Sequence, residues 1–367
     1  MKRRILIFSH EFPPYLGGVG VVGAQLATFL AEQGIEVHVM TRALAGREAV
    51  PGVVFHDVEV LPKFWFLSYR RALAAVDLKQ FDAIILNEAA PTIVAGKYFD
   101  RATLARCVVL LHGLEIESLY RGTPANMVRR LFGFASAHRR ACQMARRVVA
   151  VSDDMRTRFR AETGIESIEV LNMGANSRVF KPGTSHYRQE RKIPAETFVI
   201  VSGGRVVAEK GFGEMLEAFT ELAKQVPDIR WVICGDGDYA ESLVRSVRKK
   251  GIENKVIFEG QCTQSRLAEI YNDSDVFWLI SNYREAFPLA YIEAQLTGLP
   301  TAGRNLGGTI EAIAPEITGW LVEDANECVG IFREYAKRRD FDRSSVAEAA
   351  APYRMDNALK AIMPLLA

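Results

Sequence analysis

Residues 198–211 read Phe198-Val-Ile-Val-Ser-Gly-Gly-Arg-Val-Val-Ala-Glu-Lys-Gly211 and join a short apolar run to a glycine-rich turn. A run of four apolar residues that ends at a turn signal is typical of a strand buried in a parallel sheet. The residues after Gly211 have helical spacing. This strand, loop and helix form the repeating unit of an open α/β sheet.

The same unit recurs on both sides of this stretch. In the second half of the chain, further apolar runs predict strands at 231–234, 256–258, 276–279, 300–302 and 320–322. In the first half, they predict strands at 5–8, 37–40, 83–86, 108–111, 148–151 and 168–171, with a helix at 21–33. Strands that alternate with helices predict a doubly wound parallel sheet in each half.

The chain therefore divides into two Rossmann-like domains of ordinary size. The pattern loosens into a Pro, Gly and polar stretch between the two sets of strands, where we expect a linker. The predicted boundaries are 1–175 for the first domain, 176–194 for the linker and 195–350 for the second domain. We expect the last segment, 351–367, to form a helix that packs back toward the first domain. Ligands of such sheets bind at the carboxyl ends of the strands, so we expect the two domains to face a central cleft.

Composition narrows the class of protein. The chain has 367 residues, of which 49% are hydrophobic and 25% charged, as in a globular protein. The formal net charge of +2 argues against nucleic-acid binding. No apolar run approaches eighteen residues, and the five cysteines contain no CxxC pair, so we expect a cytoplasmic protein with reduced cysteines.

The segment Arg284-Glu-Ala-Phe-Pro-Leu-Ala-Tyr-Ile-Glu293 follows the predicted strand 276–279. Pro288 suits the first turn of a helix, whose free amides at Leu289 would face an anion. Glu285 and Glu293 would accept hydrogen bonds from sugar and ribose hydroxyls. The alternative is that both are ordinary charges at the start and on the surface of a helix.

A second cluster of polar residues lies in the opening stretch. Gly204 and Arg205 end the strand, and Lys210 precedes the helix. Two cations beside a glycine-rich loop suit a diphosphate, and each charge-assisted contact contributes about 1.5–3 kcal/mol. Without the first motif, an Arg and a Lys at this spacing would indicate only a surface loop.

Two further motifs carry competing interpretations. Residues 18–23 match the GxGxxG pattern of a dinucleotide site, and Arg42 ends the next strand, which would suit NADP. Seven residues separate these glycines from the first strand, however, whereas a dinucleotide fold has none. Asp236-Gly-Asp238 matches a metal-binding DxD, but it falls in a predicted strand-to-helix turn, where these residues serve the turn. We therefore predict no catalytic metal.

Taken in order along the chain, these motifs resemble those of glycosyltransferase family 4, retaining enzymes of the GT-B fold. The resemblance also rests on Gly235-Asp-Gly237, Phe258-Glu-Gly260 and the loop Pro13-Pro-Tyr-Leu-Gly-Gly18, and it runs from Ile5 to about Tyr353. It departs from the family at Ala286 and Pro288, which replace common glycines.

The resemblance implies a role for each matching residue. It implies that Arg205 and Lys210 hold the diphosphate, that Glu293 binds the ribose and that Glu285 contacts the donor sugar. His112, at the end of a strand, matches a family histidine near the sugar; the alternative is a loop histidine that caps the strand. The implied catalytic residues are His112, Glu285, Arg205 and Lys210, and the implied donor-binding residues are Gly17, Gly18, Gly204, Arg205, Lys210, Gly260, Gln261, Glu285, Phe287, Pro288, Leu289 and Glu293. No cofactor is implied, because the nucleotide sugar is a substrate.

The predicted partners are a nucleotide-sugar donor, linked to UDP or GDP, and a glycan or lipid-linked acceptor. Seven arginines and no acidic residue lie between Ser118 and Ser152, and a second aromatic and basic stretch covers residues 64–71. This composition suits peripheral contact with an anionic membrane on its cytoplasmic side, or else solvated helices with apolar residues in the core. Two rival functions stay open, namely a nucleotide-sugar epimerase of similar fold and an NADP-dependent oxidoreductase.

Overall fold

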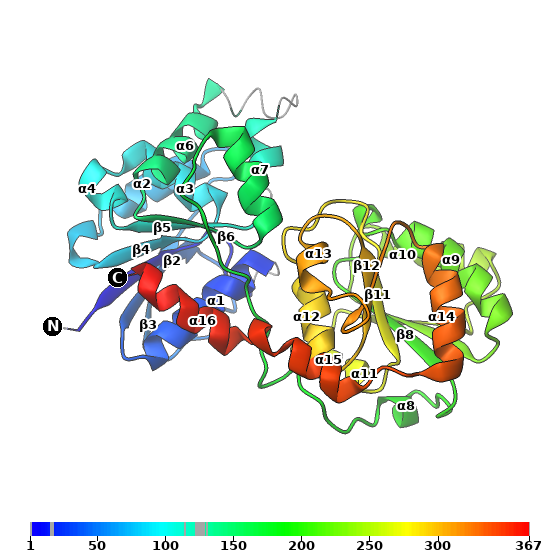
Figure 1. Ribbon diagram of the computed structural model, residues 1–367. Helices are drawn as coiled ribbons and strands as arrows, with labels where there is room; N and C mark the ends of the chain where they lie inside the picture. The colour runs from blue at the N-terminus through cyan, green and yellow to red at the C-terminus, as the bar shows by residue number, and fades with distance from the viewer. Residues whose placement is uncertain (1, 15–17, 114, 122–128, 130, 367) are drawn as a thin grey trace. The chain divides into compact units, whose positions relative to one another are not determined.

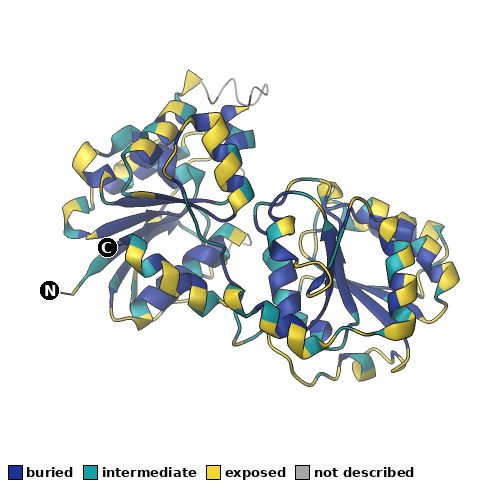
Figure 2. Cartoon of the chain, viewed as in Figure 1, coloured by how far each residue is buried: buried dark blue, intermediate teal, exposed yellow. Residues whose placement is uncertain are grey.

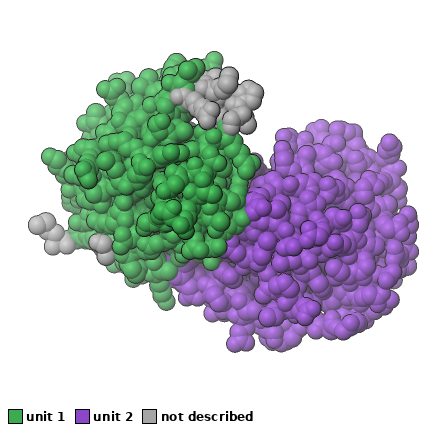
Figure 3. Space-filling model, turned by 45° about the horizontal axis from the view of Figure 1, so that its top comes forward, with its two compact units in different colours: residues 1–172, 359–367 green, residues 173–358 purple. Residues whose placement is uncertain are grey.

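The computed structural model describes residues 2–14, 18–113, 115–121, 129 and 131–366 (Figure 1). By its internal contacts the chain forms two compact units (Figure 3). Unit 1 contains residues 1–172 and 359–367, and unit 2 contains residues 173–358.

Unit 1 is built on a parallel seven-stranded sheet with the strand order β3-β2-β1-β4-β5-β6-β7. The strands are β1 (Arg4–Phe8), β2 (Glu36–Arg42), β3 (Val53–Val58), β4 (Ala83–Leu86), β5 (Cys107–Leu111), β6 (Arg147–Ala150) and β7 (Glu169–Val170). The helices that pack on it are α1 (Gly18–Glu32), α2 (Trp65–Leu73), α3 (Ala89–Tyr98), α4 (Arg101–Leu104), α6 (Phe134–Met144) and α7 (Asp153–Thr163). The central strands are buried on both faces, which explains their continuous apolar runs (Figure 2).

Unit 2 is built on a parallel six-stranded sheet with the order β10-β9-β8-β11-β12-β13. The strands are β8 (Phe198–Gly203), β9 (Ile229–Cys234), β10 (Val256–Gly260), β11 (Val276–Leu279), β12 (Thr301–Arg304) and β13 (Gly319–Val322). Its helices are α8 (Tyr187–Glu190), α9 (Phe212–Gln225), α10 (Ala240–Lys249), α11 (Gln264–Asn272), α12 (Leu289–Leu296), α13 (Thr309–Ala312), α14 (Glu327–Arg338) and α15 (Arg343–Ala349). The prediction of two doubly wound parallel sheets is confirmed.

One strand of unit 1 was not predicted. Strand β3 lies at the edge of the sheet and pairs only with β2. Its side chains are mostly half-buried or exposed, and its sequence, Val53-Val-Phe-His-Asp-Val58, mixes polar with apolar residues. It therefore lacks the continuous apolar run that revealed the inner strands.

The predicted linker and the chain end are each tied to one unit. Residues 176–194 fall within unit 2, where the Arg188 guanidinium donates to Asp275 Oδ2 at 2.8 Å. Helix α16 (Met355–Ile362) carries the chain back, and residues 359–367 belong to unit 1. There the Arg146 guanidinium donates to the carbonyl of Leu366 at 2.8 Å.

The strand orders place one switch point in each sheet. In unit 1 the direction of winding reverses between β1 and β4, and in unit 2 it reverses between β8 and β11. At such a point the two loops that leave the carboxyl ends diverge, and ligands of open α/β sheets bind in the crevice that results. The residues that follow these four strands are therefore the first candidates for a site.

Candidate active site

Close packing brings together the loops that follow β8 and β11 at the switch point of unit 2. Gly211 ends the first loop with φ +77°, and a Cβ built on it would lie 2.0 Å from the carbonyl oxygen of Ile280. The amide of Asn282 donates to the carbonyl of Glu209 at 2.7 Å. Only glycine permits this approach, which sets Lys210 beside the residues that follow β11.

Lys210 contacts Glu285 directly. Its Nζ lies 2.6 Å from Glu285 Oε1, while the Tyr283 hydroxyl donates to Glu285 Oε2 at 2.9 Å. Lys210 Nζ also lies 5.3 Å from the centre of the Tyr283 ring. Burial opposes the charged form of Lys210, but the charge of Glu285 and the bonds to Glu285 and Tyr283 outweigh it and raise the pKa of Lys210. Lys210 is thus a fixed cation at neutral pH.

Arg205 lies on the same edge of the sheet and points into solvent. It follows Gly204, whose φ is +134° and whose amide donates to the carbonyl of Cys234 at 3.0 Å. Within the described part of the chain, the Arg205 side chain has no hydrogen-bond or ion-pair partner, and the residue is exposed. Its guanidinium is therefore available to an anionic ligand.

Helix α12 begins at Leu289, one residue later than predicted. Pro288 occupies the N-cap position with φ −80° and ψ 100°, outside the first turn, because its ψ is extended rather than helical. The amides at the start of a helix have no acceptor within it, so the N-terminus of α12 offers donors and partial positive charge. The carbonyl of Glu285, a few residues earlier, accepts the amide of Gly308 at 2.9 Å, which fixes the loop.

Glu293 lies in the second turn of α12. Among the described residues its carboxyl group has no hydrogen-bond or ion-pair partner, although the residue is only partly exposed. Burial raises the pKa of Glu293 to about 8. An acceptor group that is desolvated and unpaired has bonding capacity left for a ligand that carries hydroxyls.

The other predicted donor-binding residues of unit 2 have mixed surroundings. Gly260 ends β10 with φ +66°, and its carbonyl accepts the amide of Gly235 at 2.7 Å; Gln261 next to it is exposed. Phe287 is buried and its ring lies 5.5 Å from that of Tyr353, so its visible contacts are those of a core residue.

The predicted residues of unit 1 lie after β5 and at the start of α1. His112 Nε2 is 3.1 Å from Asn87 Oδ1, and the carboxylate of the buried Glu115 accepts the amide of His112 at 2.9 Å. Burial lowers the pKa of His112 to about 4, so the imidazole is neutral at pH 7. Gly18 begins α1 and is exposed; Gly17 lies outside the described residues.

A polar cluster at the switch point of unit 1 was missed by the sequence analysis. Glu88 follows β4, and its Oε1 accepts the amide of Glu11, which follows β1, at 2.7 Å. His10 Nδ1 lies 2.9 Å from the hydroxyl of the buried Tyr69. Burial raises the pKa of Glu88 to about 8 and, with the charge of Arg42, lowers the pKa of His10 to about 4. The position of these residues directly after predicted strands was the signal that could have found them.

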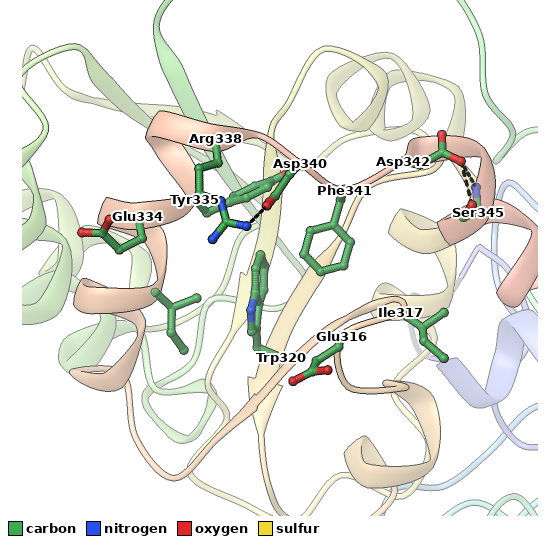
Figure 4. Close-up of a pocket in the computed structure, with 11 residues that line it drawn as sticks. Glu316, Ile317, Trp320, Glu334, Tyr335, Arg338, Asp340, Phe341, Asp342 and Ser345 are labelled. Atoms are coloured by element: carbon green, nitrogen blue, oxygen red, sulfur yellow. Dashed lines mark hydrogen bonds and ion pairs between the residues drawn. The ribbon is translucent and has the colours of Figure 1, made fainter.

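A cavity of about 700 Å³ lies elsewhere, beside β13 and α14 (Figure 4). Its lining includes Glu316 and Ile317 before β13, Trp320 within it and Phe341 after α14, so it opens at the amino end of the strand. None of the predicted site residues lines it. We place the site at the carboxyl ends, where the loops carry fixed charges.

The Asp236-Gly-Asp238 motif lies in the turn between β9 and α10. Asp236 Oδ1 accepts the amide of Gly237 at 2.8 Å, so the side chain stabilises the turn. In the part of the chain that the structure describes, no group of three or more His, Cys, Asp and Glu side chains is arranged to hold a metal ion. Nor is any described helix both long enough and apolar enough to span a bilayer.

Comparisons with known proteins identify the class. Residues 16–178 match the model of "Glycosyltransferase Family 4", and residues 184–328 match that of "Glycosyl transferases group 1". The N-acetyl-alpha-D-glucosaminyl L-malate synthase of Bacillus anthracis is 28% identical over 88% of this chain and 84% of its own. The GDP-mannose-dependent alpha-(1-6)-phosphatidylinositol monomannoside mannosyltransferase of Mycolicibacterium smegmatis is 26% identical over 87% and 85%.

Solved structures share the fold at low identity. Sucrose-phosphate synthase from Thermosynechococcus elongatus superposes with a TM-score of 0.84 at 20% identity, covering 99% of this chain and 98% of that one. HepE from Anabaena, in complex with UDP and glucose, gives 0.79 at 20% identity, covering 99% and 98%.

Each unit has a doubly wound parallel sheet, and charged loops follow the carboxyl ends of the strands in unit 2. Together with the family matches, this arrangement defines a nucleotide-sugar glycosyltransferase of the GT-B fold. The two family matches together span most of the chain. The chain belongs to glycosyltransferase family 4, and it is an enzyme of the hexosyltransferase type.

Proposed function

We propose that unit 2 binds a UDP- or GDP-linked sugar and that unit 1 binds a hydroxylated acceptor. In this proposal the sugar is transferred with retention of its anomeric configuration and without a metal ion. The observation that carries the proposal is the contact between Lys210 and Glu285 at the switch point of unit 2. It brings a cation for the diphosphate and a carboxylate for the sugar hydroxyls to one point.

The donor would be held by cations and amides at its diphosphate and by carboxyl groups at its hydroxyls. Arg205 and Lys210 supply positive charge for the diphosphate, and the N-terminus of α12 adds amide donors. Glu285 would accept hydroxyls of the sugar and Glu293 hydroxyls of the ribose. Gly260 ends β10 and Gln261 follows it, at the carboxyl ends of the same parallel sheet, and both would lie near the base. HepE was solved with UDP, and the Mycolicibacterium relative is named as GDP-mannose-dependent, which supports these two nucleotides as candidates.

The proposed chemistry needs no protein nucleophile. The departing phosphate oxygen would take the proton of the acceptor hydroxyl on the same face of the sugar, so the new bond forms where the old one breaks. Arg205, Lys210 and the α12 amides would stabilise the charge that develops on the leaving diphosphate. Burial keeps the imidazole of His112 neutral and Asn87 orients it, and this imidazole would hydrogen-bond the reacting sugar.

The acceptor would be a glycan or lipid-linked intermediate. Apolar side chains are exposed on unit 1 at Phe64, Leu67, Leu131 and Phe132, a set that we call the apolar patch. The ring of Phe132 lies 5.8 Å from that of Phe66 on α2, and Lys97 Nζ donates to the carbonyl of Phe132 at 2.7 Å. Exposed apolar groups beside cations suit the surface of an anionic bilayer.

Part of the basic run from 118 to 152 has structural contacts instead. Arg140 donates to the carbonyls of Gly96 and Phe99, and Arg147 pairs with Glu169 at 2.9 Å. Arg130 and Met127 lie outside the described residues. The proposed membrane contact therefore rests on the apolar patch and its neighbouring cations rather than on the whole run.

Ligand-induced thermal shift tests the donor assignment. A ligand that binds the folded protein raises its melting temperature in proportion to the logarithm of its concentration over Kd. We expect a UDP or GDP sugar to raise it and NADP to leave it unchanged; the reverse result would favour an oxidoreductase. With donor alone, no epimerised nucleotide sugar should form, whereas an epimerase would produce one.

Product analysis tests the retention of anomeric configuration, and vesicle flotation tests the membrane contact. Proton NMR of the first-formed product should show the same anomeric configuration as the donor, and inversion would refute the proposed mechanism.

The protein should float with vesicles that contain an anionic lipid and remain at the bottom with neutral vesicles. The double variant Phe64→Ser, Phe132→Ser should lose flotation, and unchanged flotation would exclude the apolar patch.

A further inference from the structure

We infer that Glu88, His10 and Trp65 form the subsite in unit 1 that holds the hydroxylated head group of the acceptor. This inference rests on the proposed function, which assigns the acceptor to unit 1. It goes further by naming the groups that touch the acceptor and the chemistry that they select.

The topology places these residues where a ligand would bind. The switch point of unit 1 lies between β1 and β4. His10 and Glu11 are in the loop that leaves β1, and Glu88 is in the loop that leaves β4. The amide of Glu11 donates to Glu88 Oε1 at 2.7 Å and so joins the two loops, at the position where open α/β sheets bind their ligands.

The side chain of Glu88 does not cap the helix that it precedes. Glu88 is the N-cap residue of α3, yet its carboxyl makes no cap hydrogen bond to that helix. It turns instead to the loop after β1, where the amides of Glu11 and His10 lie beside it. A carboxyl group can form more hydrogen bonds than those that the loop after β1 supplies, so this anchored group retains capacity for a ligand. The residue is only partly buried, so a ligand can reach it.

His10 presents a second fixed group on the same loop. Its Nδ1 lies 2.9 Å from the hydroxyl of Tyr69, which is completely buried. This contact orients the ring and leaves Nε2 for a ligand. Trp65, partly exposed at the start of α2, has its ring centre 6.4 Å from that of His10.

The charge state of the cluster selects neutral hydroxyls. Because burial raises the pKa of Glu88 to about 8, its carboxyl is mostly protonated at pH 7 and can both donate and accept. The imidazole of His10 is neutral at the same pH. Hydroxyl groups also both donate and accept, so a sugar or cyclitol matches this pair, and the Trp65 ring can cover its apolar face. Since Phe64 precedes Trp65 on the chain, an apolar tail on the acceptor would continue onto the apolar patch.

Polyol binding to the full chain tests the inference directly. The probes are myo-inositol and the methyl glycosides of glucose, galactose and mannose, observed by saturation-transfer NMR. We expect at least one probe to bind the wild-type protein, and Glu88→Ala and His10→Ala each to weaken it at least fivefold. Glu88→Gln, which keeps a donor and an acceptor, should retain the affinity within about threefold. The exposed Glu162→Ala on α7 is the matched control and should bind normally.

The outcomes separate this inference from the proposed function. Melting temperatures of the variants, measured alongside, show whether a loss of binding reflects unfolding; a folded Glu88→Ala protein with undiminished binding overturns the inference. Binding by no probe also overturns it. If UDP and GDP sugars fail to bind the wild-type protein, the proposed function fails, whatever the polyols do.

Discussion

Lys210 Nζ lies 2.6 Å from Glu285 Oε1, so the loops that leave β8 and β11 are joined by an ion pair at the switch point of unit 2. Both side chains are largely buried, with 14% and 9% of their surfaces exposed. The pair thus has two tasks in our account. It stabilises unit 2, and it places a cation and a carboxylate where the donor would bind.

Removal of either partner should reveal both tasks. Lys210→Ala and Glu285→Ala each leave a buried charge without its partner, and we expect a loss of about 3 kcal/mol in the unfolding free energy of unit 2. The double variant should lose less than the sum of the two, because no unpaired charge remains. Urea denaturation of the four proteins measures this. Strict additivity would show that the pair contributes nothing.

Glu293 should make stability depend on pH. Burial raises its pKa from 4.5 to about 8, so the folded protein binds more protons than the unfolded chain between these values. The contribution of Glu293 to the unfolding free energy therefore falls as the pH rises through this window, and the penalty is complete above pH 8. We expect Glu293→Gln to match the wild type at pH 4.5 and to be more stable by about 1–3 kcal/mol at pH 8.5, allowing for solvent screening. Melting curves at both pH values check this, and equal stability at pH 8.5 would be the opposite result.

Gly235, in the loop after β9, should tolerate no side chain. Gly235 has φ +138°, and a Cβ on it would lie 1.9 Å from the carbonyl oxygen of Gly204. Gly235→Ala should displace the loop that carries Arg205, with a loss of about 1–3 kcal/mol in stability and weaker nucleotide binding. The control is Gly330→Ala in α14, where a Cβ meets nothing within 4 Å and should stabilise the helix by up to about 1 kcal/mol. Equal effects at the two positions would contradict the loop geometry.

The tautomer of His112 follows from its neighbours. The Asn87 amide nitrogen donates to Ser9 Oγ and to the carbonyl of Val19, both at 3.0 Å, so its oxygen faces the histidine. Nitrogen-15 NMR should therefore show a proton on Nε2 of His112 and no titration between pH 5.5 and 8, because its pKa is about 4. Asn87→Ala should remove this preference. A protonated Nδ1 in the wild-type protein would rule out the proposed orientation.

The sequence predicted most of the fold because the inner strands are buried on both faces. Strands such as β5, whose five residues are all buried, appear as uninterrupted apolar runs. Strand β3 has no such run, because this edge strand is only partly covered and retains the polar residues His56 and Asp57. Helix starts were placed less accurately, as at Pro288, since local preference does not decide whether a residue is the cap or the first turn.

The candidate site was predicted in part for a topological reason. Parallel strands bring their carboxyl ends to one edge, so motifs that follow strands could be assigned to a common edge from the sequence alone. The ion pair between Lys210 and Glu285, 75 residues apart, could not be predicted, because it depends on the packing of Gly211 against Ile280. Glu88 was missed because a lone glutamate before a helix resembles an ordinary helix-entry charge.

Arg205 offers the cleanest test of the central claim, that unit 2 grips a sugar-linked diphosphate. It is exposed and, within the described residues, makes no contact whose loss would destabilise the fold, unlike Lys210. Calorimetric titration of the nucleotide sugar that gives the largest thermal shift should show at least tenfold weaker binding to Arg205→Ala, a difference of about 1.4 kcal/mol. Arg248→Ala, an exposed arginine on α10, should bind as the wild type does. Undiminished affinity of the folded Arg205→Ala protein would contradict the account.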